Sequence, residues 1–152
     1  MLPVIVLLHV HANVMDAGVI NVENVKQVIV IRKDLKMRRG KEIAQGAHAS
    51  IAFLTNRFVN SPNALGSLTP ADFSQAEWEW IRGNFRKICV VVDSEEELLS
   101  LVRDAQDAHL IVELIEDAGL TEFHGTLTFT AAAIGPDTDE KLDPITGHLR
   151  LY

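Results

Sequence analysis

The chain has 152 residues, of which 47% are hydrophobic and 23% are charged; this size and composition indicate one globular domain with a core rather than a disordered chain. Its single cysteine excludes a disulfide framework and a cysteine-based structural zinc site, and it fits a reducing, cytoplasmic setting. The 14 Lys and Arg residues against 21 Asp and Glu residues give a net charge of −7. This charge argues against a protein that coats nucleic acid by bulk charge, while a local basic site stays open.

The basic residues are unevenly distributed along the chain. Six of the 14 lie between residues 32 and 41, with Asp34 as the only acid among them, whereas residues 93–152 hold 14 of the 21 acids. A compact cationic segment on an otherwise acidic domain predicts a focused anion or phosphate site, and a solvated basic loop is the alternative. The six residues are Arg32, Lys33, Lys36, Arg38, Arg39 and Lys41.

Residues 1–25 are predicted to form an N-terminal extension of unknown role. Residues 4–8 are apolar, but no basic residue precedes them and the run is far shorter than the roughly 18 residues that suggest a membrane span, so neither a signal peptide nor an anchor is expected. The run could be an added strand, an oligomer contact or a product of an upstream start codon. His9 and His11 would share one face of a strand, but two histidines without a third ligand do not indicate a site, and no metal is predicted.

From residue 26 onward, strand and helix patterns alternate without an internal linker. Apolar runs predict strands at residues 28–31, 88–92, 111–115 and about 128–134, the last ended by a Gly-Pro pair. Helices are predicted from Gly40 to about residue 58, from a Thr-Pro pair at residues 69–70 to about residue 80, and after a cap at Asp93 or Ser94. This order predicts an α/β fold, a three-layer α/β/α sandwich with a mixed sheet of about four strands, formed by residues 26–152 as one domain.

Two packing predictions follow from the apolar positions. Cys89 lies inside an apolar run and is expected to be a buried small side chain rather than a nucleophile. Apolar residues recur at helical spacing in two of the helices, and each stripe is predicted to pack on the sheet. The stripes are Ile43, Ala44, Ala47, Ile51, Leu54 and Phe58 in the first helix, and Leu98, Leu101, Val102 and Ala105 in the helix after Ser94.

A polar row accompanies the apolar stripe of the first helix. Lys41, Gln45 and His48 are spaced i, i+4, i+7 and therefore lie along one side. A cation, an amide and an imidazole in this arrangement could bind an anion, orient water and move a proton, although a plain helix flank gives the same spacing. The helix N-terminus beside Arg38 and Arg39 adds backbone donors and positive potential, which suits a phosphate.

A second polar group follows the third predicted strand. Asp117 ends this strand, and ends of strands in α/β sheets are common ligand positions. Asp117 could be an acid, a base or an orienting group. Hydroxyl donors follow along the next segment, where β propensity is an equally good reason for threonine. These hydroxyls belong to Thr121, Thr126, Thr128 and Thr130.

Several separated segments together resemble one known family. They are Arg32-Lys33-Asp34-Leu35-Lys36-Met37, Gly40-Lys41, Ala44-Gln45, His48-Ala49, Asp117-Ala118-Gly119-Leu120-Thr121, Ile134-Gly135-Pro136 and Thr146-Gly147-His148-Leu149-Arg150-Leu151. In this order and spacing they look like the peptidyl-tRNA hydrolase 2 family. The resemblance spans about residues 26–152 and leaves the N-terminal extension outside it.

The resemblance implies hydrolysis of the ester that joins a peptide to the 3′ ribose of tRNA, which recycles tRNA from aborted translation. It implies neither a metal nor an organic cofactor. By position, Lys41, His48, Asp117, Thr121 and Thr130 match the family's catalytic residues. Residues 122–128 are about one residue longer than in many relatives, so Thr128 is the alternative to Thr130. Two arginines also stand at residues 38 and 39, where the family often has Gly-Lys.

The chemistry of these residue types suits ester hydrolysis. Asp117, alone or with His48, would position water, while Lys41 and a threonine hydroxyl would stabilise the developing oxyanion. Gln45 is predicted to bind substrate. The residues predicted to bind the phosphates of the tRNA substrate are Arg32, Lys36, Arg38 and Arg39.

Other functions stay open at this point. The domain could bind tRNA or another RNA without catalysis, or it could be a protein-interaction domain that forms a homodimer. Deacylation of misacylated tRNA shares the ester chemistry. The expected partner is peptidyl-tRNA, no membrane is expected, and the expected location is the cytoplasm.

Overall fold

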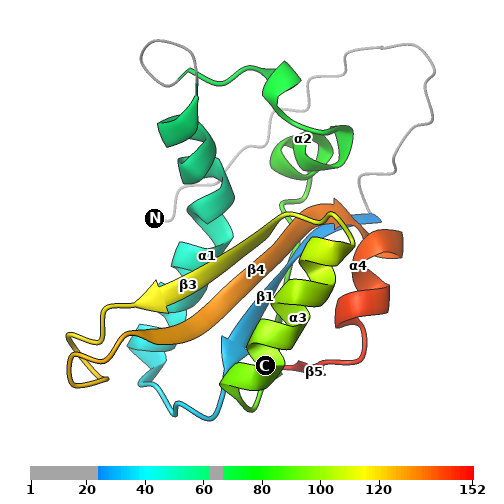
Figure 1. Ribbon diagram of the computed structural model, residues 1–152. Coiled ribbons are helices and arrows are strands. Elements are labelled where there is room, and N and C mark those ends of the chain that lie inside the picture. Colours follow the sequence, from blue (N-terminus) through cyan, green and yellow to red (C-terminus); the bar gives the residue numbers. More distant parts are fainter. Residues whose placement is uncertain (1–23, 62–66) are drawn as a thin grey trace, which may run out of the picture.

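The computed structural model describes residues 24–61 and 67–152 (Figure 1). Residues 1–23 of the predicted N-terminal extension, which include its two histidines, lie outside the described residues, whereas Val25 already belongs to the first strand of the sheet. No helix of the described ranges is long and apolar enough to cross a bilayer. In chain order the elements are β1 (Val25–Arg32), α1 (Arg39–Asn60), the short 3₁₀ helix η2 (Pro70–Asp72), α2 (Gln75–Arg82), β2 (Lys87–Val92), α3 (Glu95–Asp107), β3 (Val112–Asp117), β4 (Thr128–Thr138), α4 (Asp139–Thr146) and β5 (Arg150–Leu151).

The predicted α/β fold is confirmed. Within the described ranges, five strands form a mixed sheet in the order β3-β4-β1-β2-β5, in which β1 and β2 are parallel and the other neighbours antiparallel. Helix α1 covers one face, and α3 and α4 cover the other (Figure 1). The sheet has one strand more than predicted because β5 is two residues long, too short to show an alternation in sequence.

Strand β1 lies at the centre and divides the core. Val28 and Val30 pack in a cluster with side chains of α3, whereas Ile29 and Ile31 pack in a second cluster with Ala49 of α1. Successive side chains of a strand point to opposite faces. A strand covered on both sides therefore reads as a continuous apolar run, as residues 28–31 do.

Helix α3 forms as predicted. The Ser94 side chain accepts a hydrogen bond from the Glu97 backbone N–H at 3.1 Å and caps the helix. Its predicted stripe is buried along its whole length, so the period of the apolar residues was sufficient to identify the packed face.

The predicted packing face of α1 is wrong. Ile43 and Ile51 are 66% and 46% exposed, whereas the buried residues of the helix are Gln45, Ala49 and Phe53. The helix is therefore turned so that a glutamine of the predicted polar row faces the sheet. In this orientation the amide of Gln45 makes hydrogen bonds to side chains of β4 and β3.

One strand end and two helices also differ from the sequence predictions. Strand β4 continues past Gly135-Pro136 to Thr138 because its last residues pair with the start of β1. The predicted helix from residue 69 is split: Pro70–Asp72 forms η2, and α2 begins afresh after a second cap at Ser74. The helix α4 has no counterpart among the predicted elements.

Candidate active site

Lys41 and Asp117 meet at one end of the sheet. Strands β1 and β3 run in the same direction, so the first turn of α1, which follows β1, lies beside the carboxyl end of β3. There the Lys41 ammonium forms an ion pair with Asp117 Oδ2 and donates a hydrogen bond to Thr121 Oγ1 at 3.2 Å. The side chains of Lys41 and Asp117 are only 13% and 14% exposed. The ion pair is therefore nearly buried but still borders the solvent.

Further donors hold the Asp117 carboxylate. Gln45 Nε2 donates to Oδ2 at 2.8 Å, and the Gly119 backbone N–H donates to Oδ1 at 2.9 Å. The hydrogen bond from Lys41, followed by those from Gly119 and Gln45, holds the pKa of Asp117 below its ordinary value despite desolvation. Asp117 is therefore an ionised acceptor at neutral pH.

The turn that carries Asp117 requires glycine at position 119. Gly119 has a φ of +76°, and a Cβ there would lie 2.3 Å from the backbone oxygen of Thr126. Only glycine fits both the left-handed backbone and the close approach. This turn fixes Thr121 beside Lys41.

Of the two alternative threonines, Thr130 contacts the cluster. Its hydroxyl lies 2.7 Å from Gln45 Oε1, and the residue is 0% exposed. The Thr128 hydroxyl instead donates to the Thr126 carbonyl at 3.0 Å. Thr130 therefore touches Asp117's partner rather than the solvent-facing part of the site.

Three cations stand at the start of α1. Arg38 is 77% exposed and its Nε donates to Glu122 Oε1 at 2.7 Å, while its backbone N–H donates to Glu122 Oε2. The side chains of Lys36 and Arg39 are exposed and make no hydrogen bond or ion pair within residues 24–61 and 67–152. Sequence reasoning missed Glu122, although an acid directly after Thr121 in a site with adjacent arginines was a usable signal. Arg38 lowers the pKa of Glu122, so this acid stays ionised and anchors the basic loop.

Arg32 belongs to the fold rather than to the exposed basic loop. Its guanidinium, 8% exposed, pairs with Asp34 at 2.6 Å and with Glu95 at 2.7 Å, and it donates to the Phe129 carbonyl at 3.0 Å. The hydrogen bonds that its guanidinium donates to the Asp34 carboxylate are the main cause that raises the pKa of Arg32. With its donors engaged inside the protein, Arg32 is not positioned as the predicted phosphate ligand.

The His48 side chain is exposed and makes no hydrogen bond within the described part of the chain. It lies on the Lys41 side of α1, three residues beyond Gln45, but its imidazole forms neither a hydrogen bond nor an ion pair with Asp117 in the described residues. The structure therefore joins Lys41, Gln45, Asp117, Thr121 and Thr130 and leaves His48 outside that hydrogen-bonded group.

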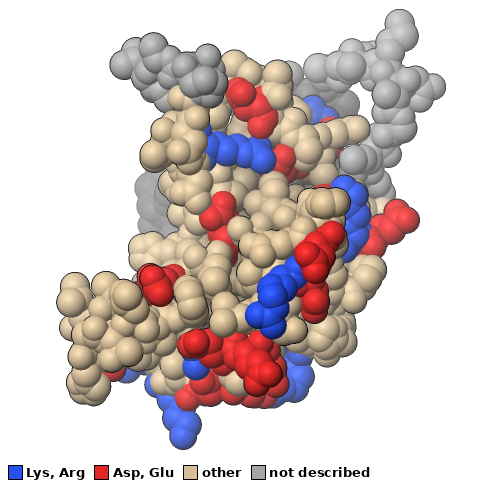
Figure 2. Space-filling model, in the orientation of Figure 1, with Lys and Arg blue, Asp and Glu red and all other residues tan. Residues whose placement is uncertain are grey.

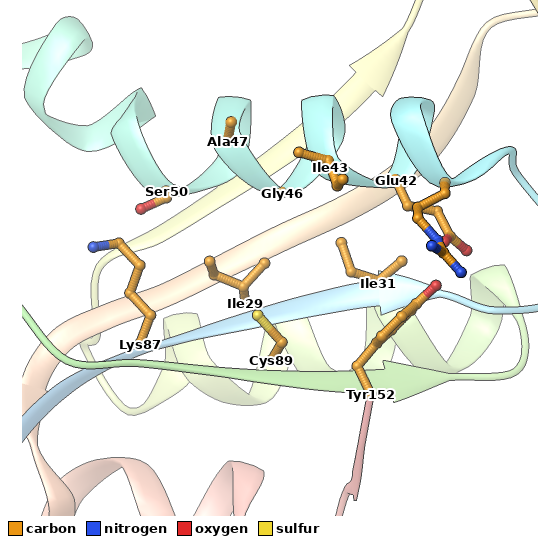
Figure 3. A pocket seen from close by; sticks show the side chains of 11 residues that line it. Ile29, Ile31, Glu42, Ile43, Gly46, Ala47, Ser50, Lys87, Cys89 and Tyr152 are labelled. Carbon is orange, nitrogen blue, oxygen red and sulfur yellow. The ribbon is translucent and has the colours of Figure 1, made fainter. Parts of the chain in front are cut away.

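An apolar groove of about 520 Å³ runs along the opposite side of α1 (Figure 3). Ile29 and Ile31 of β1 form its floor, Ile43 of α1 lines one wall, and Cys89 of β2 lies exposed in it. The prediction that Cys89 is buried is therefore wrong. Helix α1 packs over β3, β4 and β1, so among the elements of residues 24–61 and 67–152 none covers this face of β2 beside the groove.

Comparison with known proteins agrees with this geometry. The family model described as peptidyl-tRNA hydrolase PTH2 matches residues 25–152. A peptidyl-tRNA hydrolase of Methanocaldococcus jannaschii is 42% identical over 127 residues, which cover 83% of this chain and 98% of that protein. The peptidyl-tRNA hydrolase of Nanoarchaeum equitans is 38% identical, and the match covers 84% of this chain and 99% of that protein. The peptidyl-tRNA hydrolase of Methanothermobacter thermautotrophicus is 39% identical, and the match covers 83% of this chain and 98% of that protein. A match over essentially the whole described domain, with identities of this level, shows that the chain belongs to the peptidyl-tRNA hydrolase PTH2 family.

Proposed function

We propose that this chain hydrolyses the ester of peptidyl-tRNA at the group formed by Lys41, Asp117 and Thr121. The observation that carries the proposal is the contact of a lysine ammonium with both an ionised carboxylate and a hydroxyl at the solvent-facing end of the sheet. These are the groups that hydrolysis of a neutral ester needs: an acceptor for a water proton and donors for an oxyanion.

Each group has a defined part in the reaction. The Asp117 carboxylate accepts a hydrogen bond from the attacking water and takes its proton as the water oxygen bonds to the ester carbon. Negative charge then develops on the carbonyl oxygen, where Lys41 and the Thr121 hydroxyl stabilise it. Collapse of the tetrahedral intermediate breaks the bond to the ribose 3′ oxygen, which takes the proton that Asp117 accepted from the water, and the peptide carboxyl group loses its own proton to solvent. The products are a peptide carboxylate and tRNA with a free 3′ hydroxyl.

The exposed cations suit the phosphates of the tRNA end. Lys36 and Arg39 project without protein partners in the described ranges, next to the N-terminus of α1, where backbone donors and the helix dipole also favour anions. By contrast, acidic side chains gather on the face in Figure 2 at the end where α3 begins. We propose that tRNA approaches from the α1 side, away from that acidic surface.

Release of tRNA from N-acetyl-aminoacyl-tRNA tests the proposal. We expect turnover by the parent chain and a loss of about 100-fold or more in Lys41→Ala and Asp117→Ala. Lys141 and Asp137 form another lysine–aspartate pair, at 3.0 Å and away from the site, so Lys141→Ala and Asp137→Ala are matched controls and should retain parent activity. Binding of tRNA without turnover would replace the proposal with the RNA-binding function, and equal turnover of unblocked aminoacyl-tRNA would indicate general deacylation.

We further propose a cytoplasmic location, because tRNA in translation is the substrate. Homodimerisation stays a prediction of the sequence. Sizing at two protein concentrations tests it, since a reversible dimer dissociates on dilution.

A further inference from the structure

We infer that Gln45 and Thr130 are positioning residues: a buried amide and hydroxyl that hold the Asp117 carboxylate in its working orientation. The inference rests on the proposed function and changes two predicted roles, since Gln45 was expected to bind substrate and Thr130 to take part in the chemistry. Both residues lie beneath the site, 3% and 0% exposed. At that depth they act on the substrate through Asp117.

The contacts run in one line from the core to the carboxylate. The Thr130 hydroxyl lies 2.7 Å from Gln45 Oε1, and Gln45 Nε2 lies 2.8 Å from Asp117 Oδ2. The three residues come from β4, α1 and the end of β3. These hydrogen bonds therefore connect the carboxylate at the end of β3 to α1 and, through α1, to β4.

Thr130 determines which way the Gln45 amide faces. Its hydroxyl hydrogen donates to Oε1, which leaves the NH₂ group of the amide directed at Asp117. The opposite orientation would place Oε1 against an ionised carboxylate, two acceptors with no proton between them. A hydroxyl donor at position 130 consequently favours the amide orientation that stabilises ionised Asp117.

A β-bulge brings Thr130 to this position. Ile115 pairs with Ala131, but the next residue of β3, Glu116, pairs with Phe129, so Thr130 is the extra residue of β4. Ala131 packs in the same cluster as Ala49 of α1, and Thr130 also contacts α1. Two consecutive side chains on one face require such a bulge, because a regular strand would point one of them away.

Replacing Gln45 with glutamate gives a test that a purely structural role does not predict. Gln45→Glu keeps the shape but sets two carboxylates together, which raises the pKa of the pair. At low pH the pair holds one proton, and this proton restores a hydrogen bond to Asp117; as pH rises the proton is lost. We expect the deficit in kcat relative to the parent to be at least about tenfold smaller at pH 5 than at pH 8. An equal deficit at both pH values would overturn the inference.

Matched threonine variants test the other end of the line. Thr130→Val keeps the side-chain shape without a donor, and we expect kcat to fall about tenfold at unchanged KM. Thr130→Ser should stay within about twofold of the parent, as should Thr128→Val, which removes a neighbouring hydroxyl outside the line. Equal losses in Thr130→Ser and Thr130→Val would show that packing, not the hydroxyl, matters and would overturn the inference.

A readout without turnover separates this inference from the proposed function. Carbon NMR titration of the Asp117 carboxyl should give a higher pKa in Thr130→Val than in the parent chain and Thr130→Ser, because a donor to the ionised form is weakened. An unchanged pKa in Thr130→Val would overturn the positioning role even in an active enzyme. A parent chain without hydrolysis, but with the expected pKa difference, would instead overturn the proposed function alone.

Discussion

Removing the guanidinium of Arg39 tests whether tRNA phosphates bind at the start of α1. Arg39 is exposed, and neither its side chain nor that of Lys36 has a hydrogen-bonding or ionic partner among residues 24–61 and 67–152. Arg39→Ala should therefore remove a phosphate contact without breaking an interaction inside the protein. The same holds for Lys36→Ala.

The size of the effect follows from counterion release. Each phosphate neutralised on a duplex adds about 0.9 to the slope of log affinity against log salt concentration. With one phosphate each for Lys36 and Arg39, these contacts contribute a slope of about 1.8, or about a 12-fold loss of affinity between about 50 and about 200 mM salt. In either alanine variant one contact remains, so its contribution to the slope should be about 0.9, which corresponds to about a 3.5-fold loss of affinity over the same salt range.

The assay is equilibrium binding of tRNA that carries its peptide through an amide instead of an ester, so that no hydrolysis occurs during titration with salt. Arg103→Ala is the matched control, because Arg103 is an exposed arginine of α3 without a partner in the described ranges. A slope in Arg39→Ala equal to that of the parent would refute the phosphate role. An equal drop in Arg103→Ala would show that net charge, not position, sets the salt dependence.

Three other perturbations separate fold from chemistry. Arg32→Ala should lower the free energy of unfolding, measured in urea, by about 2 kcal/mol and not more, since the carboxylate partners of Arg32 stay partly solvated. The variant should leave KM for peptidyl-tRNA unchanged. A raised KM together with the stability of the parent chain would contradict the structural role of Arg32. Because the pKa of Asp117 is lowered, its carboxylate stabilises the fold fully above the unfolded-state pKa of about 3.9, and this stabilisation is lost as pH falls from there through the folded-state pKa. Since the carboxylate stays ionised over the same range, kcat should hold as pH drops toward about 4; a fall in kcat near pH 6 would implicate another group. Gly119→Ala should lower kcat at least about tenfold. Gly125 also has a positive φ, but nothing lies within 4 Å of an added Cβ there, so Gly125→Ala should lower stability alone. Equal losses of kcat in the two variants would point to backbone strain and not to the close contact with Thr126.

The sequence was informative where a single element determines the result. The stripe of α3 and its Ser94 cap depend on residues of that helix alone, and the central strand shows as an apolar run because both of its faces are covered. Helical spacing drew attention to Lys41 and the end of a strand to Asp117, but only the family resemblance connected the two residues in one site. Their contact nevertheless follows from topology, since both stand at the same end of the sheet.

Partners far away in sequence were not predictable from local patterns. The buried ion pair of Arg32 with Glu95 joins β1 to α3, and no spacing rule distinguishes it from the exposed arginines six and seven residues later. The bulge at Thr130 is a feature of strand pairing. For this reason a count of residues left Thr128 and Thr130 as alternatives, whereas the hydrogen bond to Gln45 distinguishes them.

The orientation of α1 links the candidate site to the apolar groove. Positions 43 and 45 are about 200° apart around a helix, so Ile43 and Gln45 cannot both face the sheet. Burying an isoleucine side chain is worth roughly 1.5–3 kcal/mol, yet Ile43 is 66% exposed. The buried amide is satisfied at both ends, by Thr130 and by an ionised Asp117, and a hydrogen bond to a charged group is worth a comparable amount. These two hydrogen bonds therefore offset the free energy that burial of Ile43 would contribute, and the orientation of α1 that buries Gln45 leaves Ile43 on the wall of the groove.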